Sequence, residues 1–272
     1  MKLEEIKSKA ELSKFIESYW YFDGGIQPEL ILLPDGTFNV IVAQHSFSCG
    51  AQEFPKGLYL IPITTQPVRI ITKGNLYGIR FKAFSMLNIV GKKAGLIKNI
   101  NLLETVSCAN VHASAIQPQF SKEIELELKK DALENLAFDL LNHKYELDED
   151  LRLQVNYILD RKGNLKISSL CETAGITRQG LHKNFIQSLG IGAKELAMTW
   201  KLNHFFTLMS DSDKLTGTAL DAGFYDQAHC INAFKSTWQL SPGNLQKSNP
   251  DLFAFAKESM TKRFNNFYDP EV

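Results

Sequence analysis

The segment GFYDQAHCINAFKSTWQLSP, residues 223–242, decides the fold of the second half of the chain. Gly223 suits a tight turn, because a residue without a Cβ adopts the left-handed backbone conformation at little cost. Asp226 is placed to cap a following helix. Apolar side chains then recur at three- and four-residue spacing, which predicts one buried helix face made of Cys230, Ile231, Phe234 and Trp238. Between Gly223 and Phe234 there is neither lysine nor arginine.

A second copy of this pattern lies upstream in SLCETAGITRQGLHKNFIQSLG, residues 169–190. Ser169 and Glu172 have the spacing of a capping box at the start of its first helix. The residues expected to form the turn, cap the next helix and bury its inner face are Gly175, Thr177, Leu181 and Phe185. A helical stretch, residues 193–209, joins the copies. The pattern predicts two helix-turn-helix units on a linking helix, in either a DNA-reading domain or an all-α domain that binds no DNA.

Residues 151–247 resemble the AraC/XylS-type DNA-binding domain, in which two helix-turn-helix units share one long helix. The residues that carry the resemblance are Gly175, Leu181, Phe185 and Gly190 in the first unit, and Gly223, Phe224, Asp226, Gln227, Phe234, Lys235, Ser241 and Pro242 in the second. The resemblance implies a bacterial-type transcription regulator whose two reading helices enter successive major grooves. The chain departs from the family at Asn232, where arginine is usual, and at His229-Cys230, where aromatic residues are usual.

The resemblance and the helical spacing together indicate which side chains face double-stranded DNA. In the first unit these are Arg178, Gln179, His182 and Lys183. In the second unit they are Gln227, Ala228, His229 and Asn232, followed by Lys235. Amide side chains suit adenine, whereas lysine and histidine donate to guanine. Acidic and basic residues nearly balance over residues 148–248, so the affinity for DNA is expected to depend only modestly on salt.

The first hundred residues have the pattern of a β domain. Short apolar and β-branched runs are broken by turn signals such as Pro34-Asp35-Gly36, which favours an antiparallel barrel or sandwich. Residues 10–107 also resemble, more weakly, the β-rich N-terminal domain of one regulator subgroup whose ligand is unassigned. The segments that carry this resemblance are Tyr19-Trp20, Leu33 to Gly36, and Gly78 to Phe81.

Three residues of this region are candidate ligand contacts, namely Arg69, Arg80 and Trp20. An arginine on a strand needs a partner, which either a small-molecule effector or a structural ion pair supplies. Core packing is the default role for aromatic side chains in a β domain of this size. The alternative hypothesis is that the β-rich region serves only for dimerisation or partner docking.

The expected fold class is α+β, with a barrel-like or sandwich-like N-terminal domain followed by an all-α double helix-turn-helix domain. The expected boundaries are 1–107 for the β-rich sensor or dimerisation domain, 108–147 for a helical connector, 148–248 for the double helix-turn-helix domain and 249–272 for a C-terminal amphipathic helix. A helix is also expected over residues 85–97. In the connector, leucines fall on one face over residues 119–147, which makes it a candidate dimer helix.

The last helix is expected to begin at Asn249-Pro250, an N-cap followed by a first-turn proline. Its apolar residues recur at three- and four-residue spacing and are Phe253, Ala256, Met260, Phe264 and Phe267. This pattern predicts a helix that packs back on the second unit or on the β domain, with an intermolecular contact as the alternative.

Composition narrows the class of protein. The 30 basic and 30 acidic residues cancel, so no whole-chain field attracts nucleic acid. No window has the roughly 18 apolar residues of a membrane span, and no partnership with a membrane is expected. The four cysteines are Cys49, Cys108, Cys171 and Cys230; their isolated positions fit neither a disulfide framework nor a zinc site and suit a reducing cytoplasm.

No arrangement typical of an active site is present in the sequence. The six histidines lack metal-ligand spacing, and there is no GxSxG segment or phosphate-binding loop. Cys49 near His45 is the one pair that suggests nucleophilic chemistry, such as alkyl transfer in DNA repair, although a loop thiol beside a surface imidazole is the simpler interpretation. No cofactor and no metal is expected.

The sequence therefore predicts a DNA-binding transcription regulator and not an enzyme. Its expected partner is double-stranded DNA. A second copy of the chain, a small-molecule effector and, for an activator, RNA polymerase are further candidate partners. In this hypothesis a ligand or a dimer rearrangement at the β-rich domain changes how the reading helices meet DNA.

Overall fold

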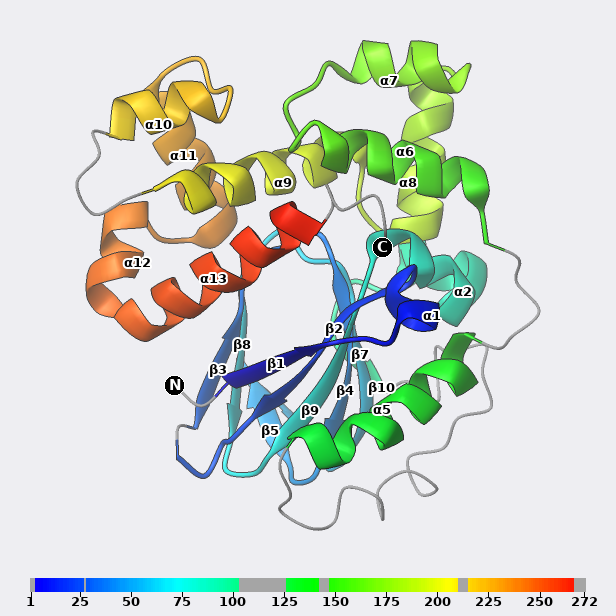
Figure 1. The fold of residues 1–272 in the computed structure, drawn as a ribbon, viewed down its shortest axis with the longest axis vertical. Helices are drawn as coiled ribbons and strands as arrows, with labels where there is room; N and C mark the ends of the chain where they lie inside the picture. Colours follow the sequence, from blue (N-terminus) through cyan, green and yellow to red (C-terminus); the bar gives the residue numbers. More distant parts are fainter. Residues whose placement is uncertain (1–2, 27, 103–125, 142–146, 210–214, 267–272) are drawn as a thin grey trace.

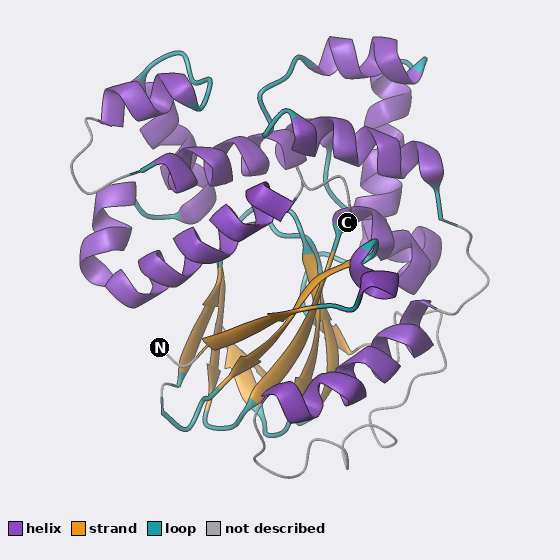
Figure 2. Ribbon diagram, in the orientation of Figure 1, coloured by secondary structure: helices purple, strands orange, loops and turns teal. Residues whose placement is uncertain are grey.

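The computed structural model describes residues 3–26, 28–102, 126–141, 147–209 and 215–266 of the chain. The strands gather in one half of the molecule, and the helices that follow residue 148 arch over one end of them (Figure 1). Coloured by secondary structure, the same view shows strands confined to the N-terminal half and a C-terminal half built of helices and loops (Figure 2). The predicted fold class, a β-rich region followed by an all-α region, is confirmed.

Two antiparallel sheets make up the β-rich half. The larger sheet has the spatial order β1 (Leu3–Lys7), β2 (Ile16–Phe22), β9 (Leu76–Phe81), β4 (Phe38–Ala43), β7 (Gly57–Ile61) and β10 (Asn101–Leu102). The smaller sheet has the order β3 (Glu29–Leu32), β8 (Val68–Thr72), β5 (Phe47–Cys49) and β6 (Gln52–Phe54). Buried side chains of both sheets form one cluster, so the sheets pack face to face.

Trp20 occupies the centre of that shared core and is 1% exposed. Its indole lies against β9 at Gly78, where an added Cβ would be 2.0 Å from the indole Cε2 atom. The indole N–H donates to the side-chain oxygen of Asn39 at 2.9 Å. Trp20 is therefore a core residue whose polar atom is satisfied, which agrees with the default role of aromatic residues in a β domain.

Short helices close one end of the sheets. They are α1 (Ala10–Ser13), the 3-10 turn η1 (Ala83–Ser85), α2 (Met86–Val90) and the 3-10 segment η2 (Gly91–Leu96). The single helix expected over 85–97 is wrong in detail, because the backbone at Gly91 has φ +59 and ends the α-helix there. Past this glycine the chain continues as a 3-10 segment.

Helix α5 (Leu126–Leu141) lies across the larger sheet. Its buried leucines are Leu133, Leu136 and Leu140, so within the described range the predicted apolar face packs on the protein's own core. Lys9 forms an ion pair with the buried carboxylate of Glu134 and ties the helix to the chain segment after β1. The rest of the helix expected over 119–147 includes residues outside those that the structure describes, as do Cys108, His112 and His143.

The C-terminal half contains eight helices among the described residues. They are α6 (Glu149–Asp160), α7 (Ile167–Ala174), α8 (Arg178–Leu189), α9 (Ala193–Leu208), α10 (Leu215–Asp221), α11 (Gln227–Trp238), α12 (Pro242–Ser248) and α13 (Pro250–Asn266). The linking helix α9 runs between the unit made of α7 and α8 and the unit made of α10 and α11 (Figure 1). None of the described helices is long and apolar enough to cross a membrane.

The two halves share a core. One cluster of buried residues continues from the larger sheet through α5 and α6 to α8 and α9. At the contact between η2 and α8, the Lys98 ammonium donates to the carbonyl oxygen of Gly190 at 2.7 Å. Gly95 lies so close to α8 that an added Cβ would be 2.7 Å from the Ile186 carbonyl oxygen. The first helix-turn-helix unit is thus docked directly on the β-rich half.

Helix α13 is the second bridge between the halves. Its described apolar residues join the core of the second unit through Leu252, Phe253, Ala256 and Met260, and they reach the main core through Phe264. The Phe264 ring packs edge-on against Trp200 of α9, with ring centroids 5.3 Å apart. The helix begins as expected, since the Leu252 N–H donates to the Asn249 side chain at 3.1 Å. Phe267 lies outside the described residues.

Candidate nucleic-acid interface

The turn of the first unit has the geometry that its sequence predicts. Helix α7 ends at Gly175, which has φ +62, and Thr177 accepts a hydrogen bond from the Gly180 N–H at 3.1 Å. The start of α7 differs from the prediction, because the helix begins at Ile167 and Ser169 lies within it. The earlier start lets Ile167 pack against the core one turn before Cys171, and this packing outweighs the capping-box spacing.

Helix α8 presents a polar face to solvent. Leu181 and Phe185 are 1% and 0% exposed and anchor the helix on the core. The opposite side exposes all four residues that the sequence assigns to DNA, namely Arg178, Gln179, His182 and Lys183. Because these four side chains are exposed, they are accessible to a duplex.

Helix α11 repeats this arrangement in the second unit. Gly223 has φ +82, and the Asp226 carboxylate accepts from the His229 N–H at 2.7 Å, as predicted for the turn and the cap. Cys230, Phe234 and Trp238 are buried on the inner side. The residues assigned to DNA on the outer side are Ala228, His229, Asn232 and Lys235, which are exposed, and Gln227, which is half-buried.

The turn of the second unit makes contacts that the sequence did not predict. Asn164, in the loop after α6, lies against Gly223, where an added Cβ would be 2.3 Å from the Asn164 Nδ2 atom. Lys201 of α9 donates to the carbonyl oxygen of Gly223 and lies over the Phe224 ring, 4.7 Å from its centroid. Burial lowers the pKa of Lys201. The turn of the second unit is therefore held by both the linking helix and the loop between α6 and α7.

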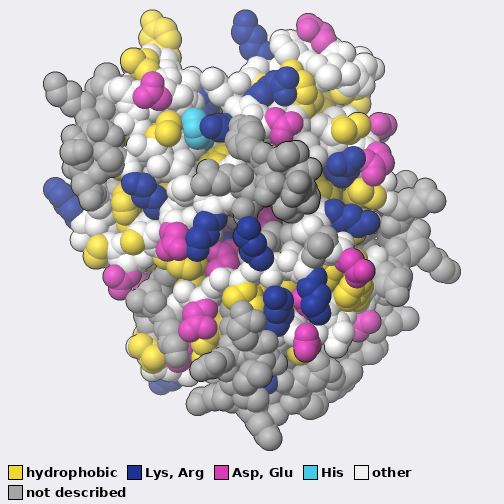
Figure 3. Space-filling view, viewed as in Figure 1, with side chains coloured by type: hydrophobic (Ala, Val, Ile, Leu, Met, Phe, Trp, Pro, Cys, Tyr) yellow, Lys and Arg dark blue, Asp and Glu magenta, His cyan; other side chains and the backbone are white. Residues whose placement is uncertain are grey.

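The surface around these units carries mixed charge. In the view of Figure 3, lysine and arginine side chains are interspersed with aspartate and glutamate over the described residues. This distribution agrees with the balanced composition of 30 basic and 30 acidic residues. A duplex on the reading helices would meet a few local cations and not a basic stripe.

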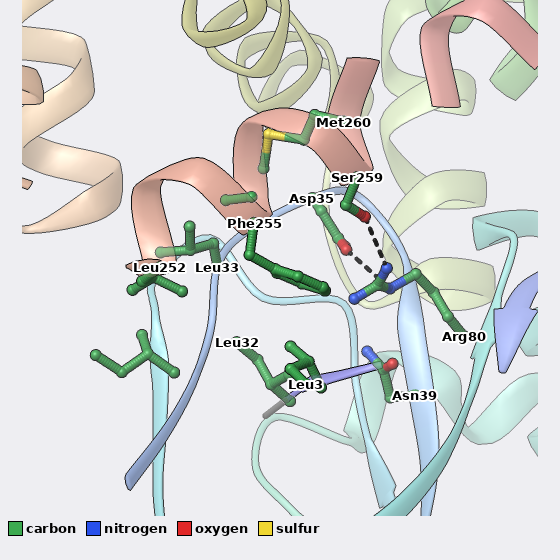
Figure 4. A pocket seen from close by; sticks show the side chains of 12 residues that line it. Leu3, Leu32, Leu33, Asp35, Asn39, Arg80, Leu252, Phe255, Ser259 and Met260 are labelled. Carbon is green, nitrogen blue, oxygen red and sulfur yellow. Dashed lines mark hydrogen bonds and ion pairs between the residues drawn. The ribbon is translucent and has the colours of Figure 1, made fainter. Parts of the chain in front are cut away.

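A separate cavity lies between the β-rich half and α13 (Figure 4). Its volume is about 40 Å³. The apolar wall comes from Leu3, Ile31, Leu32, Leu33, Leu252, Phe255, Ala256 and Met260, and the polar end from Asp35, Asn39, Arg80 and Ser259. Of the three candidate ligand residues, Arg80 alone lines this cavity.

The other two ligand candidates lie elsewhere. Arg69 is half-exposed on β8 and pairs with Glu29 of β3 at 2.9 Å, outside the cavity wall. Trp20 lies behind the wall, where it donates to Asn39. The structure thus does not bring the three residues together, because Arg69 and Arg80 belong to different sheets.

Arg80 is held in a network of side chains from distant parts of the chain. The side chain is 8% exposed, and its Nη1 atom donates to the Glu5 carboxylate and to the Ser259 hydroxyl oxygen, the latter at 3.3 Å. Its Nε atom faces the Asp35 carboxylate at 3.3 Å. The Ser259 hydroxyl in turn donates to Glu5 at 2.8 Å. The sequence did not identify Glu5, Asp35 or Ser259 as site residues, and the turn signal at Pro34-Asp35-Gly36 was the one local indication.

Cys49 has the surroundings of a structural thiol. It is half-buried at the end of β5, and burial raises its pKa. The reactive form of cysteine is the thiolate, which a raised pKa disfavours. The neighbouring candidate, His45, packs on Gly74, where an added Cβ would be 2.1 Å from the imidazole Nδ1 atom.

The family comparison concerns the region that contains both reading helices. Residues 170–248 match a family model described as a helix-turn-helix domain. This match agrees with the predicted helix-turn-helix domain of the AraC type. The match begins within α7 and ends with α12, so this helix-turn-helix domain includes both turns, both reading helices and α9.

Relatives of the chain are named as regulators. The uncharacterised HTH-type transcriptional regulators SAS0078 and SAR0107, from Staphylococcus aureus strains MSSA476 and MRSA252, are each 24% identical over 182 residues. Each alignment covers 64% of this chain and 24% of the relative, so the chain spans about a quarter of their length. The predicted class, a regulator and not an enzyme, agrees with these comparisons.

Solved structures of ToxT from Vibrio cholerae are also similar to the chain. One form has a TM-score of 0.45 at 14% identity and covers 89% of this chain and 96% of ToxT. A form of ToxT bound to an unsaturated fatty acid has a TM-score of 0.41 at 14% identity, covering 88% and 91% of the two chains.

Proposed function

We propose that this protein is a sequence-specific, DNA-binding transcription regulator whose helices α8 and α11 read adjacent major grooves. The observation that supports the proposal is that both helices follow a glycine turn, are capped at their N-termini and expose polar side chains there. A recognition helix needs this combination of an anchored inner face and a free N-terminal outer face.

Each exposed residue has a role in this proposal. In the first unit Gln179 pairs with adenine and Lys183 donates to guanine, while Arg178 and His182 contact the backbone or a neighbouring base. In the second unit Gln227 and Asn232 pair with adenine, His229 donates to guanine N7 and Ala228 contacts a thymine methyl group. Lys235 contacts a phosphate.

The relative position of the two helices supports reading of adjacent grooves. Helix α9 spans both units, and the Asn164–Gly223 and Lys201–Gly223 contacts restrain the second unit against the first. A duplex with two half-sites about one helical turn apart, roughly 10 base pairs, is the expected target. Because few lysine and arginine residues face the duplex, the salt dependence of binding should be modest.

Selection of bound sequences from random duplex DNA tests the proposal. The full chain should enrich a site with two parts, and size exclusion of the same sample reports whether one or two copies bind. The double variant Gln179→Ala/Lys183→Ala should lose specificity at one part, and Gln227→Ala/Asn232→Ala at the other. Lys194→Ala, an exposed change on α9 outside the reading faces, is the matched control. Failure to enrich any sequence would contradict the proposal.

A further inference from the structure

The cavity beneath α13 joins the β-rich half to the helix that follows the helix-turn-helix domain. Its walls come from β1, β3, β4, β9 and the turn at Asp35 on one side, and from α13 on the other. A molecule bound there would touch both halves at once. It would therefore alter the position of α13, which packs on α9 and α12.

The side chain of Phe255 fills the approach to the polar end of this cavity. It projects from α13 toward the guanidinium group of Arg80, between the leucines of the β-rich wall (Figure 4). The remaining volume of about 40 Å³ holds little more than a water molecule. An apolar cavity of about 150 Å³ binds benzene. A ligand of that size is larger than the remaining space and must therefore take the place of the Phe255 ring.

Arg80 offers such an occupant a hydrogen bond. Its Nη1 atom is used by Glu5 and Ser259, and its Nε atom faces Asp35. The Nε atom makes no hydrogen bond within the described part of the chain, and the guanidinium group lines the polar end of the cavity. A ligand in this cavity that carries an acceptor oxygen can accept a charge-assisted hydrogen bond from this guanidinium group, whose side chain is only 8% exposed.

The charge around Arg80 decides which acceptor fits. One guanidinium group faces two carboxylates, Glu5 and Asp35, so the polar end already carries a net negative charge. A ligand carboxylate would add a third negative charge in a poorly solvated site, which is unfavourable. A hydroxyl or carbonyl oxygen accepts from the guanidinium without this cost.

We propose that this cavity is an effector site for a small neutral molecule with an apolar body and a hydroxyl or carbonyl oxygen. The apolar body replaces the Phe255 ring among the leucines, and the oxygen accepts a hydrogen bond from Arg80. Binding displaces α13 from the β-rich wall and shifts its contact with α9, which links the site to the reading helices. The regulatory part of this proposal rests on the proposed function in DNA binding.

Benzyl alcohol, benzoate and toluene are matched probes, and calorimetric titration of the full chain measures their binding without DNA. The variant Phe255→Ala opens the ring's space and should bind benzyl alcohol at least tenfold more tightly than the unmodified protein. It should bind benzoate at least tenfold more weakly than benzyl alcohol. Phe255→Leu, a milder change, should give an intermediate affinity and covers the case in which the alanine variant does not fold.

Phe253→Ala is the matched control on the same helix. Phe253 packs on Phe206 in the core of the second unit, with ring centroids 4.9 Å apart, and does not line the cavity. A cavity at that site has no arginine, so this variant should show no preference for benzyl alcohol over toluene. Equal affinity of the Phe255 variants and the unmodified protein for benzyl alcohol would overturn the site. Tighter binding of benzoate would overturn its preference for neutral ligands.

A separate measurement on DNA tests the regulatory role. Saturating benzyl alcohol should change the affinity of Phe255→Ala for its selected duplex at least threefold and leave that of Phe253→Ala unchanged. Probe binding without any change in DNA affinity would overturn the effector role. A protein that binds no duplex even without probe would contradict the proposed function, and the calorimetric result would still decide whether the cavity binds the neutral probe.

Discussion

The ammonium group of Lys201 in the linking helix donates to the backbone carbonyl oxygen of Gly223 at the turn of the second unit. Asn164, from the loop between α6 and α7, packs on the same glycine. A single turn residue thus contacts both the helix that joins the units and the loop that leads into the first unit. This junction determines where α11 lies relative to α8.

Replacement of Gly223 should disrupt this junction. Gly223→Ala places a Cβ at a φ of +82 and 2.3 Å from the Asn164 Nδ2 atom. The left-handed conformation alone costs about 1–2 kcal/mol, and displacement of Asn164 adds to it. The free energy of unfolding, measured in urea, should fall by more than about 2 kcal/mol. Affinity for the selected duplex should fall as well.

Gly175→Ala is the matched control for this change, since Gly175 has φ +62 but an added Cβ would meet nothing within 4 Å. It should show the conformational cost alone. Equal losses of stability in the two variants would mean that the Asn164 contact contributes nothing.

Gly217 should be replaceable with a gain in stability. It lies inside α10, is exposed, and an added Cβ would meet no atom within 4 Å. Alanine is favoured over glycine inside a helix by about 0.5–1 kcal/mol, so Gly217→Ala should raise the free energy of unfolding by that amount. Gly36→Ala is the contrast, because its Cβ would lie 2.5 Å from the Trp200 Nε1 atom and should destabilise the protein. A loss of stability in Gly217→Ala would show that α10 is not a regular helix there.

Asn232→Arg should tighten binding to DNA if α11 lies in a major groove. The residue is exposed on the outer face, and an arginine there gains a bidentate contact to guanine or an ion pair to phosphate. Such contacts are worth about 1–3 kcal/mol, so the dissociation constant for a duplex with guanine at that position should fall roughly tenfold. Titration of labelled duplex at constant salt measures it.

The control adds the same charge away from the reading helices. Asn99→Arg changes an exposed residue between η2 and β10. If both variants tighten binding equally, the effect comes from net charge and α11 does not enter the groove.

Acid should destabilise the protein through His204. Burial, and to a lesser extent the charge of Lys162, lower the pKa of His204 to about 4. A histidine in an unfolded chain has a pKa near 6.5. Between pH 4 and 6.5 the unfolded chain therefore binds a proton that the folded protein does not bind. The stabilising contribution is complete above pH 6.5 and is lost as the pH falls toward 4.

The expected loss is roughly 1–3 kcal/mol, seen as a falling Tm between pH 6.5 and 4. His204→Gln removes the titrating group and should flatten this dependence. His229→Gln, an exposed replacement on α11, should not. A pH profile unchanged by His204→Gln would assign the acid sensitivity to other groups.

Local features of the helix-turn-helix units were predictable from sequence. Gly175 and Gly223 have the left-handed backbone conformation that was predicted for them. Thr177 and Asp226 cap α8 and α11, as predicted. The start of α7 was predicted wrongly, because capping-box spacing at Ser169 competes with burial of Ile167, and only packing decides between them.

The candidate effector cavity was only partly predictable. A strand arginine signals a need for a partner, which singled out Arg80 and Arg69 alike. Only the structure separates them, since Arg69 pairs across two strands with Glu29 whereas Arg80 binds the first strand and the last helix. Phe255 carried no signal at all, because an apolar residue on an amphipathic helix looks the same whether it fills a core or a ligand site.

The sequence by itself determined the elements whose causes lie within a few residues of each other. Turns, caps and buried helix faces follow from backbone sterics and from three- and four-residue spacing, so they can be predicted from the sequence. The tertiary structure alone decided the meeting of Ser259 with Glu5, which are 254 residues apart, and of Asn164 with Gly223. Such contacts depend on how whole faces of helices and sheets pack, and no short stretch of sequence encodes that arrangement.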